Sequence, residues 1–353
     1  MIMRWRYISL ASILLLTSVL SGQDYQVRTR VDVVVVPTTV TDSDDKLVAG
    51  LTQKDFSIRE DDIPQTIVNF SSDPQQLSAA IIVDTGMGGI AMRRLAPLFI
   101  SVTGGFSIFD EMASFRYDHF VHQLSDFTGD PEQIERSFAI VKTIAEQQSP
   151  NVQQGDPAPT APRVVRLLLG FLNIGPQGTP PVPTASPTIL KPNGQSPYGP
   201  GAVPSSRVLY DALYEAARAL EQRPSSHRKI IFIISDGQVR GPTHNREDTL
   251  NLLIRDQIQL YAVTTDGGAF EGQFSVLQSF AEATGGDVFQ GLSTSAMEGA
   301  FSRITEQARN QYVLGYQSTN RVGMTHPVFR EIEVTTRNPK LKVTHRKGYY
   351  QAP

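Results

Sequence analysis

The sequence predicts an α/β protein with a doubly wound, mostly parallel sheet at its core and β segments on both sides. Between residues 77 and 310, short apolar runs such as AAIIVD and KIIFIIS alternate with segments of helical periodicity. Fully apolar strands separated by helices are typical of a parallel sheet covered on both faces. Residues 23–76 and 311–353 instead carry alternating, β-branched runs. We expect these two β segments to join as one small β-sandwich.

The individual elements follow in chain order. The first β segment contains the runs YQVRTRVDVVVVPTTVTDSDD, DFSIRE and QTIVNF, and the last contains QYVLGYQS, FREIEVTTRN and LKVTHRKGYY. The central domain adds the strands EMASFRYDH and IQLYAV and the amphipathic helix VLYDALYEAARALEQ. Further helices are predicted around residues 93–103, 132–147, 274–284 and 296–309, and another begins at about Arg246.

Residues 1–22 predict a secretory signal peptide. Two arginines precede an apolar run from about Tyr7 to Leu20, and the small residues Ser21 and Gly22 follow it. A run of roughly 14 apolar residues is short for a membrane span. We therefore expect a secreted or periplasmic protein with no stable membrane span after cleavage.

Composition excludes several classes of function. The net charge is −3 and the pI about 6.1, so no basic excess favours nucleic acid or an anionic membrane as partner. The chain has no cysteine. Disulfides, thiol catalysis, lipidation at a cysteine and cysteine-based zinc sites are thereby excluded.

A proline-rich insertion, residues 149–205, interrupts the central domain. It holds 13 of the 23 prolines and includes the apolar run RVVRLLLGFLN. Loops of this length in a compact domain are usually functional or disordered. Two interpretations stay open: an ordered cover over one face of the domain, or a flexible segment whose apolar patch contacts a partner.

The stretch IIVDTGMGG suggests three kinds of site. An aspartic protease would need a second Asp-Thr/Ser-Gly turn, whereas the other aspartate turns read SDGQ at Asp236 and TDGG at Asp266. A dinucleotide site would need a Gly-x-Gly-x-x-Gly spacing that is absent here. The third kind fits better, because Asp84 and Asp236 each follow an apolar strand. Ligands of α/β sheets bind at that carboxyl edge.

Several ordered motifs resemble the von Willebrand factor A (VWA) domain of the VWFA-related acidobacterial family. They are AAIIVDTGMGG, DEMASFRYDHFVHQLSDFTGD, RVLYDALYEAARAL, KIIFIISDGQ, LQSFAEATGGDVF and QYVLGYQS. The resemblance implies a metal-ion-dependent adhesion site made of Asp-x-Ser-x-Ser, a threonine on a later loop and the aspartate of Ser-Asp-Gly. Such a site holds Mg²⁺ through oxygen ligands and leaves one position for a carboxylate of the partner.

This sequence departs from that pattern at three positions. Gly86 and Gly88 replace the serines, and Arg207 stands at the position of the threonine. We predict that the Arg207 guanidinium takes the place of the cation and pairs with Asp84 or Asp236. The candidate edge therefore comprises Asp84, Thr85, Gly86, Gly88, Arg207 and Asp236.

No cofactor is expected at this edge, although a slipped loop with Ser205 or Ser206 would leave weak Mg²⁺ binding open. Arg207 could form a structural salt bridge or capture an acidic group of a partner. The predicted function is non-catalytic binding of another protein, as an adhesion or scaffold module. The alternatives are a structural role in an envelope assembly and a hydrolase that uses Asp84 and Asp236.

Two further groups of residues could suggest a metal site or a serine nucleophile. Asp118, His119 and His122 lie close together in sequence, but in a hairpin setting, so we expect solvated side chains rather than a metal site. Ser235 lacks the Gly-x-Ser-x-Gly context of a nucleophile elbow.

Overall fold

The computed structural model describes residues 33–87, 106–147, 207–264, 271–290, 294–321 and 325–353. Three sequence predictions lie outside the described residues: the signal peptide, the helix around 93–103 and the proline-rich insertion. Residues Val33–Pro353 form one compact unit.

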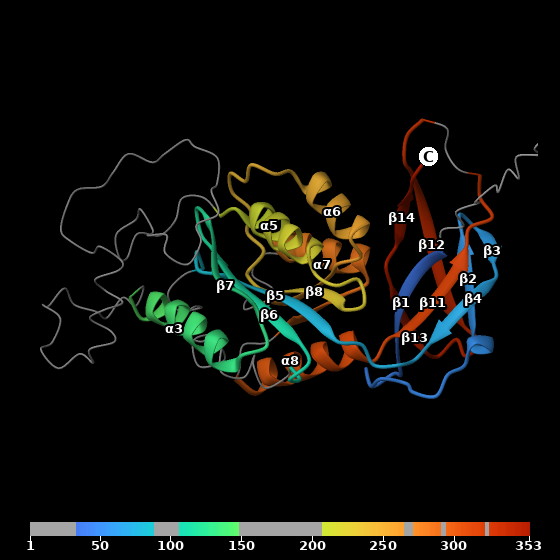
Figure 1. Ribbon diagram of the computed structural model, residues 1–353, viewed down its shortest axis with the longest axis horizontal. Coiled ribbons are helices and arrows are strands. Elements are labelled where there is room, and N and C mark those ends of the chain that lie inside the picture. The colour runs from blue at the N-terminus through green and yellow to red at the C-terminus, as the bar shows by residue number, and fades with distance from the viewer. Residues whose placement is uncertain (1–32, 88–105, 148–206, 265–270, 291–293, 322–324) are drawn as a thin grey trace, which may run out of the picture. The chain divides into compact units, whose positions relative to one another are not determined.

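The central element is a six-stranded sheet with the order β10-β9-β8-β5-β6-β7 (Figure 1). Its strands are β5 (Leu77–Asp84), β6 (Glu111–Tyr117), β7 (Val121–Thr128), β8 (Arg228–Ile234), β9 (Gln259–Thr264) and β10 (Asp287–Gln290). All neighbours pair in parallel except β7, which is antiparallel to β6. Every residue of β5 is buried, as its apolar sequence predicts for a central parallel strand.

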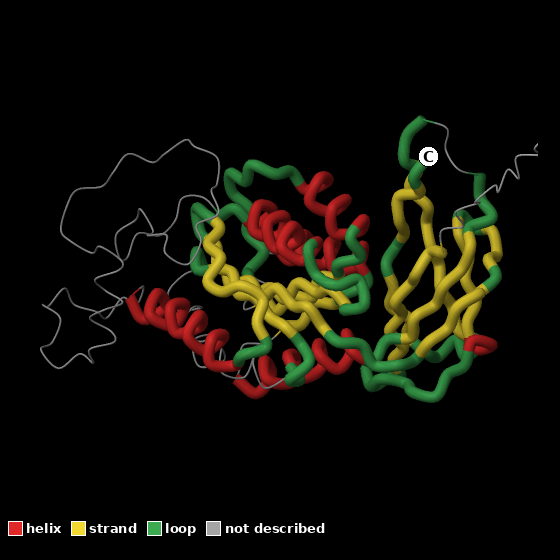
Figure 2. Tube along the Cα trace, viewed as in Figure 1, coloured by secondary structure: helices red, strands yellow, loops and turns green. Residues whose placement is uncertain are grey.

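Helices cover both faces of this sheet (Figure 2). They are α3 (Pro131–Gln147), α5 (Leu209–Glu221), α6 (Arg246–Arg255), α7 (Glu271–Thr284) and α8 (Thr294–Arg309). Ile81 and Val83 of β5 pack in one core with α3 and α8. Ala80 and Ile82 pack in the other core with α5, α6 and α7. The predicted doubly wound, mostly parallel sheet is confirmed.

The β segments at either side form two four-stranded sheets, which we call the double sheet. Their orders are β13-β1-β11-β4 and β14-β12-β2-β3. The strands are β1 (Val33–Thr41), β2 (Phe56–Glu60), β3 (Ile63–Gln65), β4 (Ile67–Ser71), β11 (Tyr312–Gln317), β12 (Val328–Thr336), β13 (Lys342–His345) and β14 (Gly348–Gln351); a 3-10 turn, η1 (Gln53–Asp55), precedes β2. The two sheets share one hydrophobic core that includes Val36, Ile58, Leu314 and Val334. Strands from both ends of the chain therefore pair within each sheet.

Polar side chains join the double sheet to the α/β part. Arg228, at the start of β8, donates hydrogen bonds to the side-chain oxygens of Gln311 and Gln75. Gln311 in turn donates to the hydroxyl of Thr39, at 2.9 Å. These groups are satisfied only when both parts are folded.

Backbone segments approach closely between α7 and β10. A Cβ atom on Gly286 would lie 1.8 Å from the carbonyl oxygen of Leu260. This position therefore excludes every residue with a side chain unless the backbone shifts. No helix in the described part of the chain is long and apolar enough to cross a membrane.

Candidate functional site

Two carboxylates meet at the carboxyl edge of the six-stranded sheet. Asp84 is the last residue of β5, and Asp236 follows the end of β8 by two positions. Because β5 and β8 are parallel neighbours, their carboxyl ends lie at the same edge. The side chain of Asp84 is fully buried, whereas that of Asp236 is 13% exposed.

Arg207 lies between these carboxylates. Its backbone exchanges two hydrogen bonds with Arg240, of 2.9 and 3.0 Å, immediately before α5. Its Nη2 donates to Oδ2 of Asp84 at 2.5 Å, and its Nη1 donates to Oδ2 of Asp236 at 2.8 Å. The guanidinium therefore bridges both carboxylates, and the predicted ion pair involves the two acids at once. Only 6% of the arginine side chain is exposed.

Gly86 provides the room for this arginine. A Cβ atom at Gly86 would lie 3.2 Å from Oδ1 of Asp84 and 3.3 Å from Nε of Arg207, which is tighter than ordinary packing. The Gly86 amide donates to Oδ1 of Asp84 at 2.9 Å. A glycine at this position and an arginine at 207 therefore fit one another sterically.

The other predicted edge residues have different positions. Thr85 is buried, and its hydroxyl donates to the carbonyl of Tyr117 at 3.0 Å rather than to either carboxylate. Gly88 lies outside the described residues.

The sequence did not predict that two hydroxyl groups at the edge would contact Asp84. Tyr117 donates to Oδ2 of Asp84 at 2.9 Å, and Ser235 donates to the same oxygen at 3.0 Å. Tyr117 is the register partner of Asp84 across β5 and β6. Its position at the end of the strand EMASFRY is the one sequence signal that could have indicated it. Together with Arg207, these donors satisfy a carboxylate that has no access to water.

Burial dominates the electrostatics of the edge. It raises the pKa of Asp84 to about 6, against the opposing effect of the Arg207 charge. Burial also raises the pKa of Tyr117, so its hydroxyl keeps its proton. For Arg207, burial works against the charge, but Asp84 and its other neighbours raise the pKa above its usual range. With Asp84 ionised, the two carboxylates and one guanidinium give the edge a net charge of −1.

The Asp84 shift predicts a pH dependence of stability. The folded-state pKa lies above the ordinary value of 3.8, so folded protein holds a proton that unfolded protein has lost between about pH 4 and 6. The contribution of Asp84 to the free energy of unfolding is fully present below about pH 4 and is lost as the pH rises through 6. In urea titrations, the unfolding free energy of wild type should fall across this range relative to the Asp84→Asn variant. A constant difference between the two proteins would contradict this expectation.

The prediction of a solvated Asp118, His119 and His122 group is wrong. His119 and His122 are 8% and 3% exposed, because helices α3 and α5 both contact β7. Asp118 pairs with Arg116 at 2.9 Å, and His122 is 4.0 Å from it. Burial lowers the pKa of His122 to about 3, so the imidazole is neutral. These residues form a buried polar cluster beside the edge.

The described residues contain no group of three or more His, Cys, Asp or Glu side chains that could hold a metal ion. At the edge, two carboxylates remain as hard oxygen ligands, and a cation between them would have to displace the Arg207 guanidinium. Mg²⁺ prefers about six oxygen ligands in octahedral geometry. The donor set therefore fits an arginine better than a resident Mg²⁺.

No protein-family model and no curated protein matches this sequence. Similar solved structures include BatB from Bacteroides thetaiotaomicron, with 11% identity, a TM-score of 0.39, and coverage of 66% of this chain and 98% of that chain. Proximal thread matrix protein 1 from the mussel byssus has 11% identity and a TM-score of 0.42; the match covers 71% of this chain and 51%, about half, of that protein.

The VWA domain of SpRpn10 is another similar structure, with 10% identity, a TM-score of 0.35, and coverage of 64% of this chain and 93% of that chain. The described sheet agrees with the VWA-like fold predicted from the motifs.

Proposed function

We propose that this chain is an exported, non-catalytic protein-binding module whose carboxyl sheet edge is a metal-free form of a metal-ion-dependent adhesion site. The supporting observation is the bridge that Arg207 forms between Asp84 and Asp236. In this proposal the guanidinium supplies the positive charge that a cation supplies elsewhere. Binding to the partner protein, in an adhesion or scaffold role, then needs no divalent metal.

The geometry of Arg207 supports a structural role over direct capture of an acidic group. Both Nη atoms are already occupied by Asp84 and Asp236. Nε is buried and has no hydrogen-bond partner among the residues that the structure describes. Only 6% of the arginine side chain is exposed, so a carboxylate of the partner could not reach the remaining N–H groups without a rearrangement of the edge. We infer that the salt bridge keeps the edge in one conformation and that contacts to the partner come from the surrounding loops.

The hydrolase alternative has less support. Ser235 is fully buried, and its hydroxyl contacts Asp84, Tyr117 and the Gly237 amide. The hydrogen bonds that Ser235 makes within the described part of the chain include none to a histidine, so they provide no general base for a serine nucleophile. Arg207 also contacts both carboxylates of the edge.

Titration calorimetry with Mg²⁺ and Mn²⁺ tests this proposal. Wild-type protein should give no binding heat at micromolar metal. A triple variant with Gly86→Ser, Gly88→Ser and Arg207→Thr restores the three hydroxyls and removes the competing charge, so it should bind metal measurably. Adding Asp84→Ala to the triple variant is the matched control and should abolish that binding. Micromolar affinity in wild type would overturn the proposal.

The proposal of export rests on the predicted signal peptide at 1–22, and we further propose domain boundaries near residues 76 and 310. N-terminal sequencing of the protein recovered outside the cytoplasm should begin close to residue 23. An intact Met1 in that fraction would contradict export by cleavage.

A further inference from the structure

A basic cavity of about 360 Å³ lies at the amino edge of the six-stranded sheet. The first residues of β8, the loop before it and the end of α6 line it, together with parts of β1 and β11. Four of its residues are basic, namely His227, Arg228, Lys229 and Arg255, and one is acidic, Asp256. Since β5 and β8 run in parallel, this cavity and the Asp84 edge lie at opposite ends of the strands.

Two of these four side chains lie beside carboxylates. Arg255 pairs with Asp256 at 2.8 Å and with Glu221 at 3.2 Å. His227 lies 3.6 Å from Glu111, which also accepts a hydrogen bond of 2.8 Å from Arg223. The acids around the cavity are therefore already matched by cations.

Arg228 and Lys229 remain without a carboxylate partner in the described part of the chain. Arg228 is only 5% exposed. Its Nη atoms donate to the neutral amide oxygens of Gln311 and Gln75. Its Nε has no hydrogen-bond partner within the described ranges. The Nζ of Lys229 donates to the backbone carbonyl of Glu221 at 3.3 Å. Arg228 and Lys229 thus both line this cavity, and neither has a carboxylate partner among the described residues.

Burial of Arg228 without a counter-ion has a cost. Burial lowers the pKa of its guanidinium to about 10, which still leaves it charged at neutral pH. Buried charges are normally paired because desolvation disfavours an isolated ion. A bound anion would supply the missing partner.

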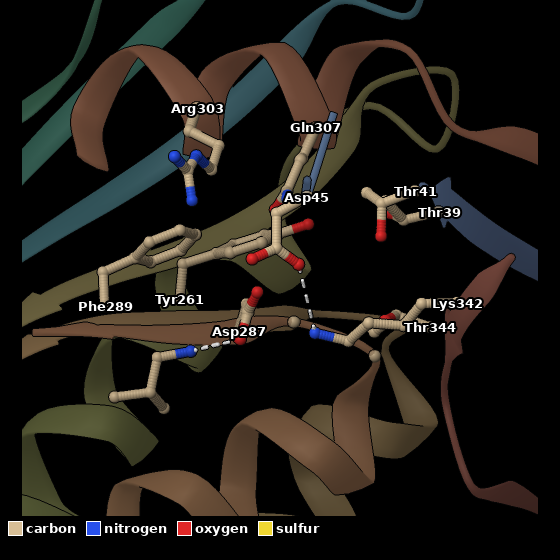
Figure 3. A pocket seen from close by; sticks show the side chains of 13 residues that line it. Thr39, Thr41, Asp45, Tyr261, Asp287, Phe289, Arg303, Gln307, Lys342 and Thr344 are labelled. Atoms are coloured by element: carbon tan, nitrogen blue, oxygen red, sulfur yellow. Dashed lines mark hydrogen bonds and ion pairs between the residues drawn. The ribbon is translucent and has the colours of Figure 1, made fainter. Parts of the chain in front are cut away.

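A second cavity shows the contrast (Figure 3). It has about 300 Å³ and carries two acids, Asp45 and Asp287, and two bases, Arg303 and Lys342. Lys342 lies 3.7 Å from Asp45. Its charges balance, so an excess of positive charge is not a general property of cavities in this protein.

We propose that the basic cavity binds the phosphate group of a small phosphorylated molecule. A phosphate dianion matches the two uncompensated charges in number. Arginine and lysine are both common phosphate ligands, the first through its planar fork and the second as a point charge. The volume is within the lower range of small-molecule sites, and it leaves space for an organic group beyond the phosphate. This assignment is independent of the proposed role of the Asp84 edge.

Calorimetric titrations at pH 7.5 and constant ionic strength test the assignment, with inorganic phosphate, glucose 6-phosphate, glucose and succinate as probes. Both phosphates should bind saturably to wild type, and glucose should give no heat. Lys229→Met should weaken phosphate binding about tenfold or more, as expected when one charged contact of about 1.4 kcal/mol is lost. Lys342→Met removes the same charge from the balanced cavity and should leave phosphate binding unchanged.

Three results would overturn the assignment. They are the absence of saturable heat with either phosphate, equal weakening by Lys229→Met and Lys342→Met, and binding of succinate as tight as that of phosphate. Arg228→Lys keeps the charge but removes the planar fork, so it should weaken binding while circular dichroism stays that of wild type. Unchanged phosphate binding in a folded Arg228→Lys protein would also contradict the assignment of the basic cavity as a phosphate site.

Discussion

Replacing Arg207 by methionine is expected to lower the free energy of unfolding by about 3–5 kcal/mol, the usual cost of removing one partner from a buried ion pair. The change leaves Asp84 with no exposure to water and no counter-ion. Asp236 loses its partner as well, but its 13% exposure reduces that part of the cost. The loss should be larger at pH 7.5 than at pH 5, because Asp84 can take up a proton at the lower pH.

Urea unfolding of matched variants measures this effect. Arg136→Ala is the control, since Arg136 is 66% exposed and lies 3.6 Å from Glu132; exposed pairs contribute about 0–1 kcal/mol. Adding Asp84→Asn to Arg207→Met removes the isolated charge and should recover part of the lost stability. A loss below about 1 kcal/mol for Arg207→Met would mean that the bridge does not stabilise the edge.

Replacing Gly286 by alanine should destabilise the protein more than Arg207→Met does. We expect the free energy of unfolding to fall by more than about 4 kcal/mol, or no folded protein to form. The added Cβ would lie 1.8 Å from the Leu260 carbonyl oxygen, which belongs to the backbone of β9. Since β9 pairs with β10, relief of this contact requires the two strands to separate.

Gly299→Ala provides the matched control for this substitution. Gly299 lies within α8, and nothing lies within 4 Å of a Cβ built on it. Alanine favours a helix over glycine by roughly 0.5–1 kcal/mol, so the variant should be as stable as wild type or more stable. Thermal and urea unfolding compare the two variants, and equal stabilities would contradict the steric argument.

The architecture was largely predictable because burial patterns appear directly in the sequence. The run AAIIV before Asp84 is apolar throughout, and β5 is buried on both sides. The Arg207 bridge was also predictable in kind, since an arginine at a position where the resembling family has threonine needs an acidic partner. The sequence did not indicate that both Asp84 and Asp236 would share it.

Other features depend on tertiary packing that local sequence does not encode. Tyr117 reaches Asp84 because β5 and β6 align at that register, and a shift by one residue would turn it away. His122 appeared polar and exposed in a hairpin, yet helices cover β7 and leave it 3% exposed. The basic cavity is formed by residues from five separate parts of the chain. None of these segments has a sequence that indicates a binding site by itself.

The pairing within the double sheet has a consequence for the order of folding. Strand β1 lies between β11 and β13, and Val33 pairs with Gln317, so its partners are synthesised last. Contacts of such large sequence separation form slowly. The α/β part between them consists of more local units and can fold first. During synthesis β1 must therefore wait as an unpaired strand, a period in which chaperones or other chains can bind it.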